Sequence, residues 1–493
     1  MNKFLFTTIF FLLTTFASAQ NDHEIRAVWL ATIGGIDWPR TYATSPSTIN
    51  RQKQELTNML DKLKKININT ILIQTRVRGT VIYPSMYEPW DGCMSGKPGV
   101  TPGYDPLKFA IEECHKRGME IHAWVVTIPI GKWNNLGCKR LRQKYPKLVI
   151  KIGDEGYLHP EQANTADYLA DICEEITRNY NVDGIHLDYI RYPETWKGRI
   201  NRQRGREHIT NIVRIIHNRI KPIKPSIKLS CSPLGKHDDL ARYSSKGWNA
   251  RNTVCQDAQA WLNNGLMDQL YPMIYFKDNN FYPFAIDWAE HSREGQVAAG
   301  LGIYFLDPKE GNWHIDEVKR QLNVCRQAGL GQCFFRAKFL TDNIQGIYNY
   351  LRVFNFAQNN TASNSNLTEE ANRFSNLWSP AITIPTLSSS NRIPASSTND
   401  QVSTLTADKW KTINNTLPWI QNDGQLAQMP QKSRMLDADI ILVTSLAGNA
   451  IATLPWSAAT INISRLPNGT YILNSLGKRG TTHRIGFMEI KRQ

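Results

Sequence analysis

Apolar runs and amphipathic segments alternate along the chain from Ile25 to Phe356. Eight short apolar runs show little internal alternation, which is typical of parallel strands with both faces covered. They are Ile25–Ala31, Thr70–Val77, Glu120–Thr127, Gly184–Tyr192, Ile227–Pro233, Asp268–Phe276, Gln296–Phe305 and Gln332–Leu340. Segments with apolar residues at helical spacing follow them, at Ile49–Lys65, Pro106–Arg117, Gln162–Tyr180, Arg202–Ile220, Thr253–Asn264, Phe284–Arg293, Ile315–Ala328 and Asn343–Phe356. The pattern predicts an α/β fold, a (β/α)8 TIM barrel.

The long connections follow predicted strands rather than predicted helices. Arg78–Asp105, Ile128–Glu161 and Leu234–Asn252 are the longest of them. Loops at the carboxyl ends of the strands carry the binding and catalytic groups of such a barrel. We therefore expect a barrel over residues 20–358 with an enlarged catalytic rim and a substrate cleft.

The composition changes after about Asn359, where Asn, Ser and Thr become frequent. We interpret residues 359–374 as a linker and residues 375–493 as a β-rich C-terminal domain. Short β-prone runs and turns, such as the one at Asn468–Gly469, alternate in this region. The pattern predicts a small β-sandwich-like domain, and a fibronectin type III-like fold is one candidate for it.

The first 19 residues resemble a targeting segment. Lys3 precedes an apolar run, and Ala17–Ala19 forms a small-residue cleavage site. No later segment is long and apolar enough to span a bilayer, so we expect no transmembrane segment in the mature chain. The sequence thus predicts an exported protein, either periplasmic or extracellular.

Charge and cysteine spacing exclude several classes of function. The net charge is +15, from 58 Lys and Arg against 43 Asp and Glu. It suits a dispersed basic surface or an anionic glycan or envelope partner, whereas export disfavours nucleic acid. None of the eight Cys has CxxC spacing, so a structural zinc site is unsupported. His122 and His186 could face each other, but no third ligand has suitable spacing, and we expect no metal and no cofactor. A disulfide between Cys93 and Cys138 stays open.

The segment Val182–Pro193, VDGIHLDYIRYP, carries the strongest chemical signal. Asp188 lies at the end of a predicted buried strand, where a TIM barrel places catalytic groups. An aspartate that only caps a helix or pairs with Arg191 is the alternative. Cations favour the charged form of a carboxyl, so Asp188 would stay ionised if it lay near Arg191 and Arg76. It is therefore a candidate nucleophile or base.

Glycosidic cleavage usually requires two carboxyl groups, one of which protonates the leaving oxygen. Glu310 is our first choice for this acid and Asp278 our second. Other polar and aromatic groups at the predicted strand ends would bind a carbohydrate substrate, with rings packing on sugar faces. They are Gln74, Arg76, Trp124, His186, Arg191, Tyr275 and Asp307.

These segments resemble the family-10-like glycosyl hydrolases, an exported bacterial group with a barrel domain. The resemblance covers about residues 24–358 and includes EIRAVWLATIGGIDWP, TILIQTRVRGTVIYPSMYEPW, VDGIHLDYIRYP and GLGIYFLDPKEGNW. It implies hydrolysis of O-glycosyl bonds and supports Asp188, which matches the family's DGIHLDY motif. It does not identify the acid, and Val125–Pro129 departs from the family's usual Asn-Pro continuation. Residues 461–493 also resemble a bacterial C-terminal sorting tail.

We therefore predict an exported glycoside hydrolase that cleaves a poly- or oligosaccharide with a carboxylate pair centred on Asp188. A non-catalytic glycan-binding or cell-envelope protein on a barrel scaffold is the alternative, since a fold does not fix a function. The sugar, the linkage, the retaining or inverting outcome and the oligomeric state stay open.

Overall fold

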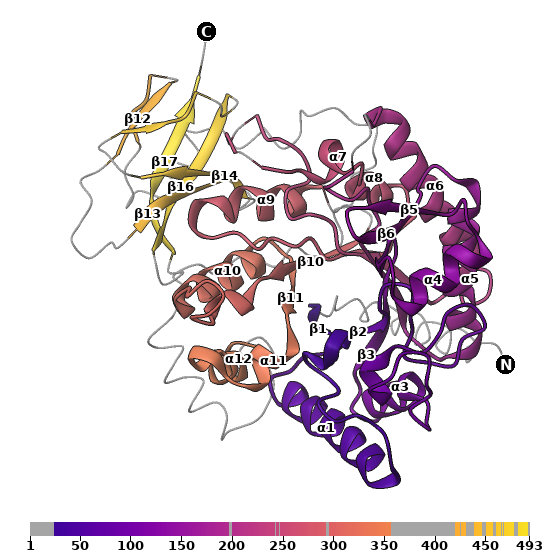
Figure 1. The fold of residues 1–493 in the computed structure, drawn as a ribbon. Helices are drawn as coiled ribbons and strands as arrows, with labels where there is room; N and C mark the ends of the chain where they lie inside the picture. Colours follow the sequence, from indigo (N-terminus) through magenta and orange to yellow (C-terminus); the bar gives the residue numbers. More distant parts are fainter. Residues whose placement is uncertain are drawn as a thin grey trace, which may run out of the picture.

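Eight parallel strands close into a barrel in the computed structural model (Figure 1). Neighbouring strands follow the order β1-β11-β10-β9-β8-β7-β3-β2. Their bounds are β1 (Arg26–Leu30), β2 (Thr70–Arg76), β3 (Glu120–Val126), β7 (Gly184–Asp188), β8 (Lys228–Cys231), β9 (Gln269–Leu270), β10 (Gln296–Leu301) and β11 (Gly331–Phe335). Each predicted strand contains or overlaps one of them, so the TIM barrel is confirmed.

The structure describes residues 24–355 and 420–491. Short gaps interrupt these ranges at 197–199, 242, 246, 292–294, 424, 430–437, 446–449, 457–459, 465, 467 and 478–481. The predicted targeting segment, the linker at 359–374 and the first part of the predicted C-terminal domain lie outside the described residues.

Helices surround the barrel as the sequence predicts. The long ones are α1 (Pro46–Lys65), α3 (Pro106–Lys116), α5 (Ala163–Asn179), α6 (Arg202–Ile220), α9 (Tyr282–Glu290), α10 (Ile315–Gln327) and α12 (Ile347–Phe354). The predicted helix Thr253–Asn264 is instead two short ones, α7 (Ala250–Thr253) and α8 (Ala258–Asn263). Cys255 between them has a φ of 60°, which an α-helix does not accommodate. The last predicted strand, Gln332–Leu340, is too long, because β11 ends at Phe335 and α11 (Ala337–Thr341) follows it before α12.

The strand that carries Asp188 ends earlier than predicted. The apolar pattern extends to Tyr192, but β7 stops at Asp188. Tyr189 adopts a φ of 53°, a left-handed conformation that an aromatic residue rarely takes and that no strand can continue. The chain therefore turns immediately after the carboxylate, which leaves Asp188 as the last residue of its strand.

The long connection after β3 contains a small sheet of its own. Strands β4 (Pro129–Lys132), β5 (Val149–Ile152) and β6 (Glu155–Leu158) pair antiparallel in the order β4-β6-β5, and α4 (Leu136–Lys144) joins β4 to β5. This insertion stands on the catalytic side of the barrel, because it begins at the carboxyl end of a barrel strand. The predicted enlarged rim therefore contains regular secondary structure in this loop.

The C-terminal region forms two antiparallel sheets with their own hydrophobic core. The larger sheet has the order β14-β13-β16-β17, and β12 pairs with β15. The bounds are β12 (Leu426–Gln428), β13 (Ala438–Ser445), β14 (Ala450–Pro455), β15 (Thr460–Asn462), β16 (Gly469–Gly477) and β17 (Thr482–Ile490). A β-rich second domain is thus confirmed, whereas its fibronectin type III identity stays a prediction.

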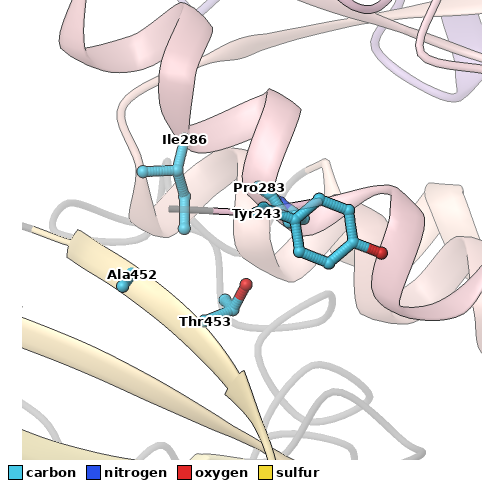
Figure 2. A pocket seen from close by; sticks show the side chains of 5 residues that line it. All are labelled: Tyr243, Pro283, Ile286, Ala452 and Thr453. Carbon is cyan, nitrogen blue, oxygen red and sulfur yellow. The ribbon is translucent and has the colours of Figure 1, made fainter. Parts of the chain in front are cut away.

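The two domains touch where β14 lies beside α9 (Figure 1). Figure 2 shows Ile286 and Pro283 of α9 facing Ala452 and Thr453 of β14, with Tyr243 at the edge of the same small pocket. The Tyr243 hydroxyl also donates to Asn280 Oδ1 at 2.9 Å. Tyr243 lies in the loop after β8, so the C-terminal domain contacts a loop of the barrel's catalytic rim.

Two further expectations concern membranes and cysteines. Within the described residues, no helix combines the length and apolar character needed to cross a membrane. All eight cysteines are buried free thiols. The disulfide considered between Cys93 and Cys138 is therefore not formed.

Candidate active site

Asp188 is held at the barrel mouth by its own backbone and by the end of β3. It is the last residue of β7 and is 8% exposed. Its carbonyl oxygen accepts hydrogen bonds from Thr127 N at 2.9 Å and from Thr127 Oγ1 at 2.8 Å. These contacts extend the β3–β7 pairing one residue past β3 and fix the main chain at the carboxylate.

Three neutral donors surround the Asp188 carboxylate. Trp124 Nε1 donates to Oδ2 at 3.1 Å, while Ser232 Oγ and Tyr189 N each donate to Oδ1 at 2.8 Å. An ionised carboxylate only accepts hydrogen bonds, so this set of donors suits the charged form. The sequence pattern predicts Arg76 and Arg191 as the neighbours of Asp188. The structure has these three neutral donors instead, and both arginines pair with other carboxylates.

The prediction that Arg76 binds sugar is wrong. Its side chain has no solvent exposure, and its Nε and Nη2 contact Glu88 at 2.6–3.0 Å. Its Nη1 donates to the carbonyl oxygens of Val126 and Thr127. A guanidinium that is enclosed in this way cannot reach a substrate. Glu88 lies in the loop after β2, and no pattern in the sequence marks it as the partner.

Arg191 belongs to the rim but serves a different carboxylate from the predicted one. Its guanidinium contacts Glu194 Oε1 at 2.9 and 3.1 Å and stacks 3.9 Å above the ring of Tyr189. It therefore stabilises the turn that follows Asp188. Substrate contact by Arg191 stays a prediction.

His186 and Gln74 differ in what they leave for a ligand. His186 is fully buried below Asp188, where it accepts from Trp29 Nε1 at 3.2 Å and contacts Ser230 Oγ at 3.0 Å. Burial, with a smaller contribution from His122, lowers the pKa of His186 well below its usual value, so the ring is neutral. The predicted substrate contact of His186 is wrong. Gln74 Oε1 accepts from Thr32 N and Ile33 N, which leaves its amide NH2 group for a ligand.

A row of aromatic rings runs from the barrel mouth along the loop after β10. Phe335 and Tyr304 lie 5.6 and 5.9 Å from Tyr275 between ring centroids, and Tyr304 lies 4.0 Å from Phe305. Phe305 stacks on Trp313 at 4.6 Å. Burial raises the pKa of Tyr275 well above its usual value, and the charges of nearby groups, including Asp188, add to this effect. The row begins at Phe335, the last residue of β11, and therefore at the barrel mouth.

Glu310, the first acid candidate, lies in the loop after β10 that carries Tyr304, Phe305 and Trp313. It is exposed in the turn after the short helix η3 (Ile303–Leu306). Burial, followed by the charge of Glu310, raises the pKa of Tyr304 to about 12. Tyr304 in turn packs against Tyr275.

Asp307 and Asp278 have structural partners instead. Asp307 Oδ1 accepts from Lys309 N at 2.9 Å and shapes the turn, and its role in substrate binding stays a prediction. Asp278 is 58% exposed and pairs with Arg320 of α10 at 3.3 Å. The role of Asp278 as an acid stays a prediction.

Ser232, Thr127 and Glu194 are site residues that the sequence pattern did not identify. A signal existed for Ser232, because strand alternation from Ser230 places it on the inward face of the predicted strand Ile227–Pro233. Thr127 ends another predicted strand, and its role depends on main-chain contacts that no pattern reveals.

One group of possible metal ligands occurs among the described residues, away from this site. Asp287 and Glu290 of α9 and His291, which follows the helix, bring one ligand atom each within 4.8 Å of one another. His291 Nδ1 and Gln259 Nε2 already contact Asp287. The expectation that the protein uses no metal stays a prediction.

Comparison with known proteins identifies the family. The model of a family described as glycosyl hydrolase-like 10 matches residues 24–204 and 200–304. The chain belongs to the glycosyl hydrolase-like 10 family. The family that the sequence motifs predict is thereby confirmed. The family match includes Trp124, Asp188 and Ser232 but stops before Glu310, so membership does not decide the acid.

Two relatives in this family are named as glycosyl hydrolases. Glycosyl hydrolase YngK of Bacillus subtilis (strain 168) is 31% identical over 370 residues, which cover 67% of this chain and 71% of YngK. Glycosyl hydrolase DigH of Escherichia coli (strain K12) is 29% identical over 354 residues, covering 62% of this chain and 80% of DigH. A solved structure, alpha-L-fucosidase isoenzyme 2 from Paenibacillus thiaminolyticus, gives a TM-score of 0.45 at 15% identity over 67% of this chain and 50% of its own.

Proposed function

We propose that this member of the glycosyl hydrolase-like 10 family is a glycoside hydrolase that cleaves O-glycosyl bonds of a poly- or oligosaccharide. The observation that carries the proposal is the environment of Asp188. A carboxylate with three hydrogen-bond donors lies at the mouth of a TIM barrel, and a row of aromatic rings that suits sugar faces begins at the same mouth. The names of the two relatives support the same class of reaction.

Asp188 acts as the nucleophile or base in this proposal. Its donors orient the carboxylate and keep both oxygens anchored, which a positioned nucleophile requires. Glu310 is the acid that protonates the leaving oxygen; the support is its place in the loop after β10, which also carries Tyr304, Phe305 and Trp313. Trp124, Tyr275 and the amide of Gln74 contact the sugar.

The test is product release from a panel of bacterial, plant and host glycans, measured by mass spectrometry. Wild type should release product, and Asp188→Asn should release none. Glu310→Gln should lose activity on natural glycans but keep activity on aryl glycosides, whose leaving groups need no proton. Glu112→Gln is the matched control, because Glu112 is exposed on α3 and remote from the mouth.

Each outcome has a distinct meaning. Activity of Asp188→Asn equal to wild type would exclude Asp188 as the central carboxylate. Equal loss by Glu310→Gln on natural and aryl glycosides would exclude Glu310 as the acid. Glycan binding without product from wild type would favour the non-catalytic alternative.

We also propose that the protein is exported to the periplasm or beyond. The support is the pattern of Lys3, the apolar run and the cleavage site at Ala17–Ala19. N-terminal sequencing of the protein recovered from outside the cytoplasm should begin at Gln20. Recovery of a chain that begins at Met1 from the cytoplasm alone would contradict the proposal.

A further inference from the structure

Arg76 connects two parts of the barrel mouth that are distant in sequence. It is the last residue of β2, and its Nη1 donates to Thr127 O at 2.8 Å and to Val126 O. These two carbonyl groups lie at the end of β3. The remaining donors of the same guanidinium face Glu88.

The residues that Arg76 holds are those that hold Asp188. Val126 is the register partner of Asp188, and Thr127 donates from both N and Oγ1 to the Asp188 carbonyl oxygen. The chain then turns away at Tyr189 in a left-handed conformation. The left-handed conformation of Tyr189 costs energy, so the turn does not by itself hold Asp188. The contacts with the end of β3 must therefore keep Asp188 in place.

The Arg76 guanidinium is itself held by Glu88, which Tyr168 also contacts. Glu88 accepts two bonds from Arg76 Nε and a further bond from the Tyr168 hydroxyl at 2.7 Å. Burial and the charge of Glu88 raise the pKa of Tyr168 well above its usual value, so its hydroxyl remains a donor. Tyr168 belongs to α5. The planar guanidinium uses its donors on two sides at once, which a lysine could not do.

We propose that Arg76 is a positioning residue for Asp188, acting through the main chain of Val126 and Thr127. The proposal rests on the proposed role of Asp188 in catalysis. Because Arg76 and Glu88 are enclosed, the effect is transmitted through hydrogen bonds and not through contact with the sugar. A role in stability alone would lower the amount of folded enzyme and leave the geometry of the folded site unchanged.

Thr127→Val tests the contact between Thr127 and the Asp188 carbonyl oxygen, and it changes the shape of the side chain little. It removes the Oγ1 donor but keeps the backbone donor, so the variant should fold. We expect kcat to fall by roughly 10- to 100-fold, because displacement of a reacting group by about 1 Å can cost this much. KM should stay within about twofold of wild type, since no sugar contact is lost. Arg76→Lys should give the same split between kcat and KM.

A second readout does not depend on activity. The indole N–H resonance of Trp124 reports its hydrogen bond to Asp188 and is assigned by its loss in Trp124→Phe. It should shift in Thr127→Val and Arg76→Lys. The control is Tyr83→Phe: Tyr83 lies in the same loop as Glu88, and the change removes its buried bond of 2.9 Å to Glu175 of α5. This control should keep both the wild-type kcat and the Trp124 resonance.

The proposal is overturned if Thr127→Val retains the wild-type kcat and an unshifted Trp124 resonance. It is also overturned if Tyr83→Phe loses as much activity as Thr127→Val, because the effect would then be general packing. Full activity of Asp188→Asn would instead remove the proposed function. The resonance would still show whether Arg76 positions the Asp188 side chain.

Discussion

The substitution Glu88→Gln should destabilise the barrel more than any change to a surface ion pair. Glu88 is 3% exposed in its side chain and Arg76 is 0% exposed. Glutamine preserves the shape and one acceptor but removes the negative charge. The guanidinium then remains buried without a charged partner.

The expected loss of unfolding free energy is about 3–5 kcal/mol, the usual cost of removing one partner of a buried ion pair. For a domain larger than 250 residues, this corresponds to a fall in Tm on the order of 5–10 °C. Differential scanning calorimetry on the full chain, with tryptophan fluorescence in urea, would measure it. The double variant Arg76→Met/Glu88→Gln should lose less than the sum of the single losses, because it leaves no buried charge.

Glu174→Gln on α5 is the matched control. Glu174 pairs with Arg178 and Arg219, whose side chains are 58% and 35% exposed, so its loss should cost about 1 kcal/mol or less. If Glu88→Gln also cost less than about 1 kcal/mol, the pair would not be desolvated and the reasoning from burial would be refuted.

Three further predictions concern pH, thiols and the domain contact. Burial alone would raise the pKa of Glu120, but His122 and Lys228 outweigh it and lower the pKa to about 2. Its contribution to stability is therefore present above about pH 4.5, the pKa in the unfolded chain, and is lost as the pH falls toward 2. In Glu120→Gln the midpoint of urea unfolding should depend less on pH between these two values, and an unchanged dependence would contradict the assignment. Thiol titration should find eight reactive thiols in unreduced, guanidinium-unfolded protein and almost none in folded protein, whereas six would indicate a disulfide. Ile286→Arg places a charge in the contact of α9 with β14, so protease should release the C-terminal domain faster than from wild type, and equal rates would show that this contact does not hold the domains together.

The barrel was predictable because burial leaves a strong pattern. Each strand is covered on both faces, so its sequence is an apolar run that differs from the amphipathic helices around it. The boundaries were less predictable. Nothing in the identities of Tyr189 or Cys255 indicates a positive φ, and both residues end or divide a predicted element.

The candidate site was predictable in position but not in its contacts. Asp188 lies at the end of its strand, as the sequence predicts, because the strand period and the charged residue together mark that place. The arginines were misassigned because a long side chain reaches carboxylates outside its own strand. Arg76 pairs with Glu88, which lies 12 residues further along in a rim loop. Sequence spacing alone does not reveal such a contact.

The distribution of charge at the mouth follows from these contacts. Arg76 is paired with Glu88 between the ends of β2 and β3, and Arg336 is paired with the buried Asp37 between the ends of β11 and β1. Both arginines are therefore neutralised by their own carboxylates. Asp188 instead receives hydrogen bonds from neutral donors only, so its negative charge is oriented without being cancelled. A glycosidic transition state develops positive charge on the sugar ring, and a preorganised carboxylate of this kind stabilises that charge better than one already paired with an arginine.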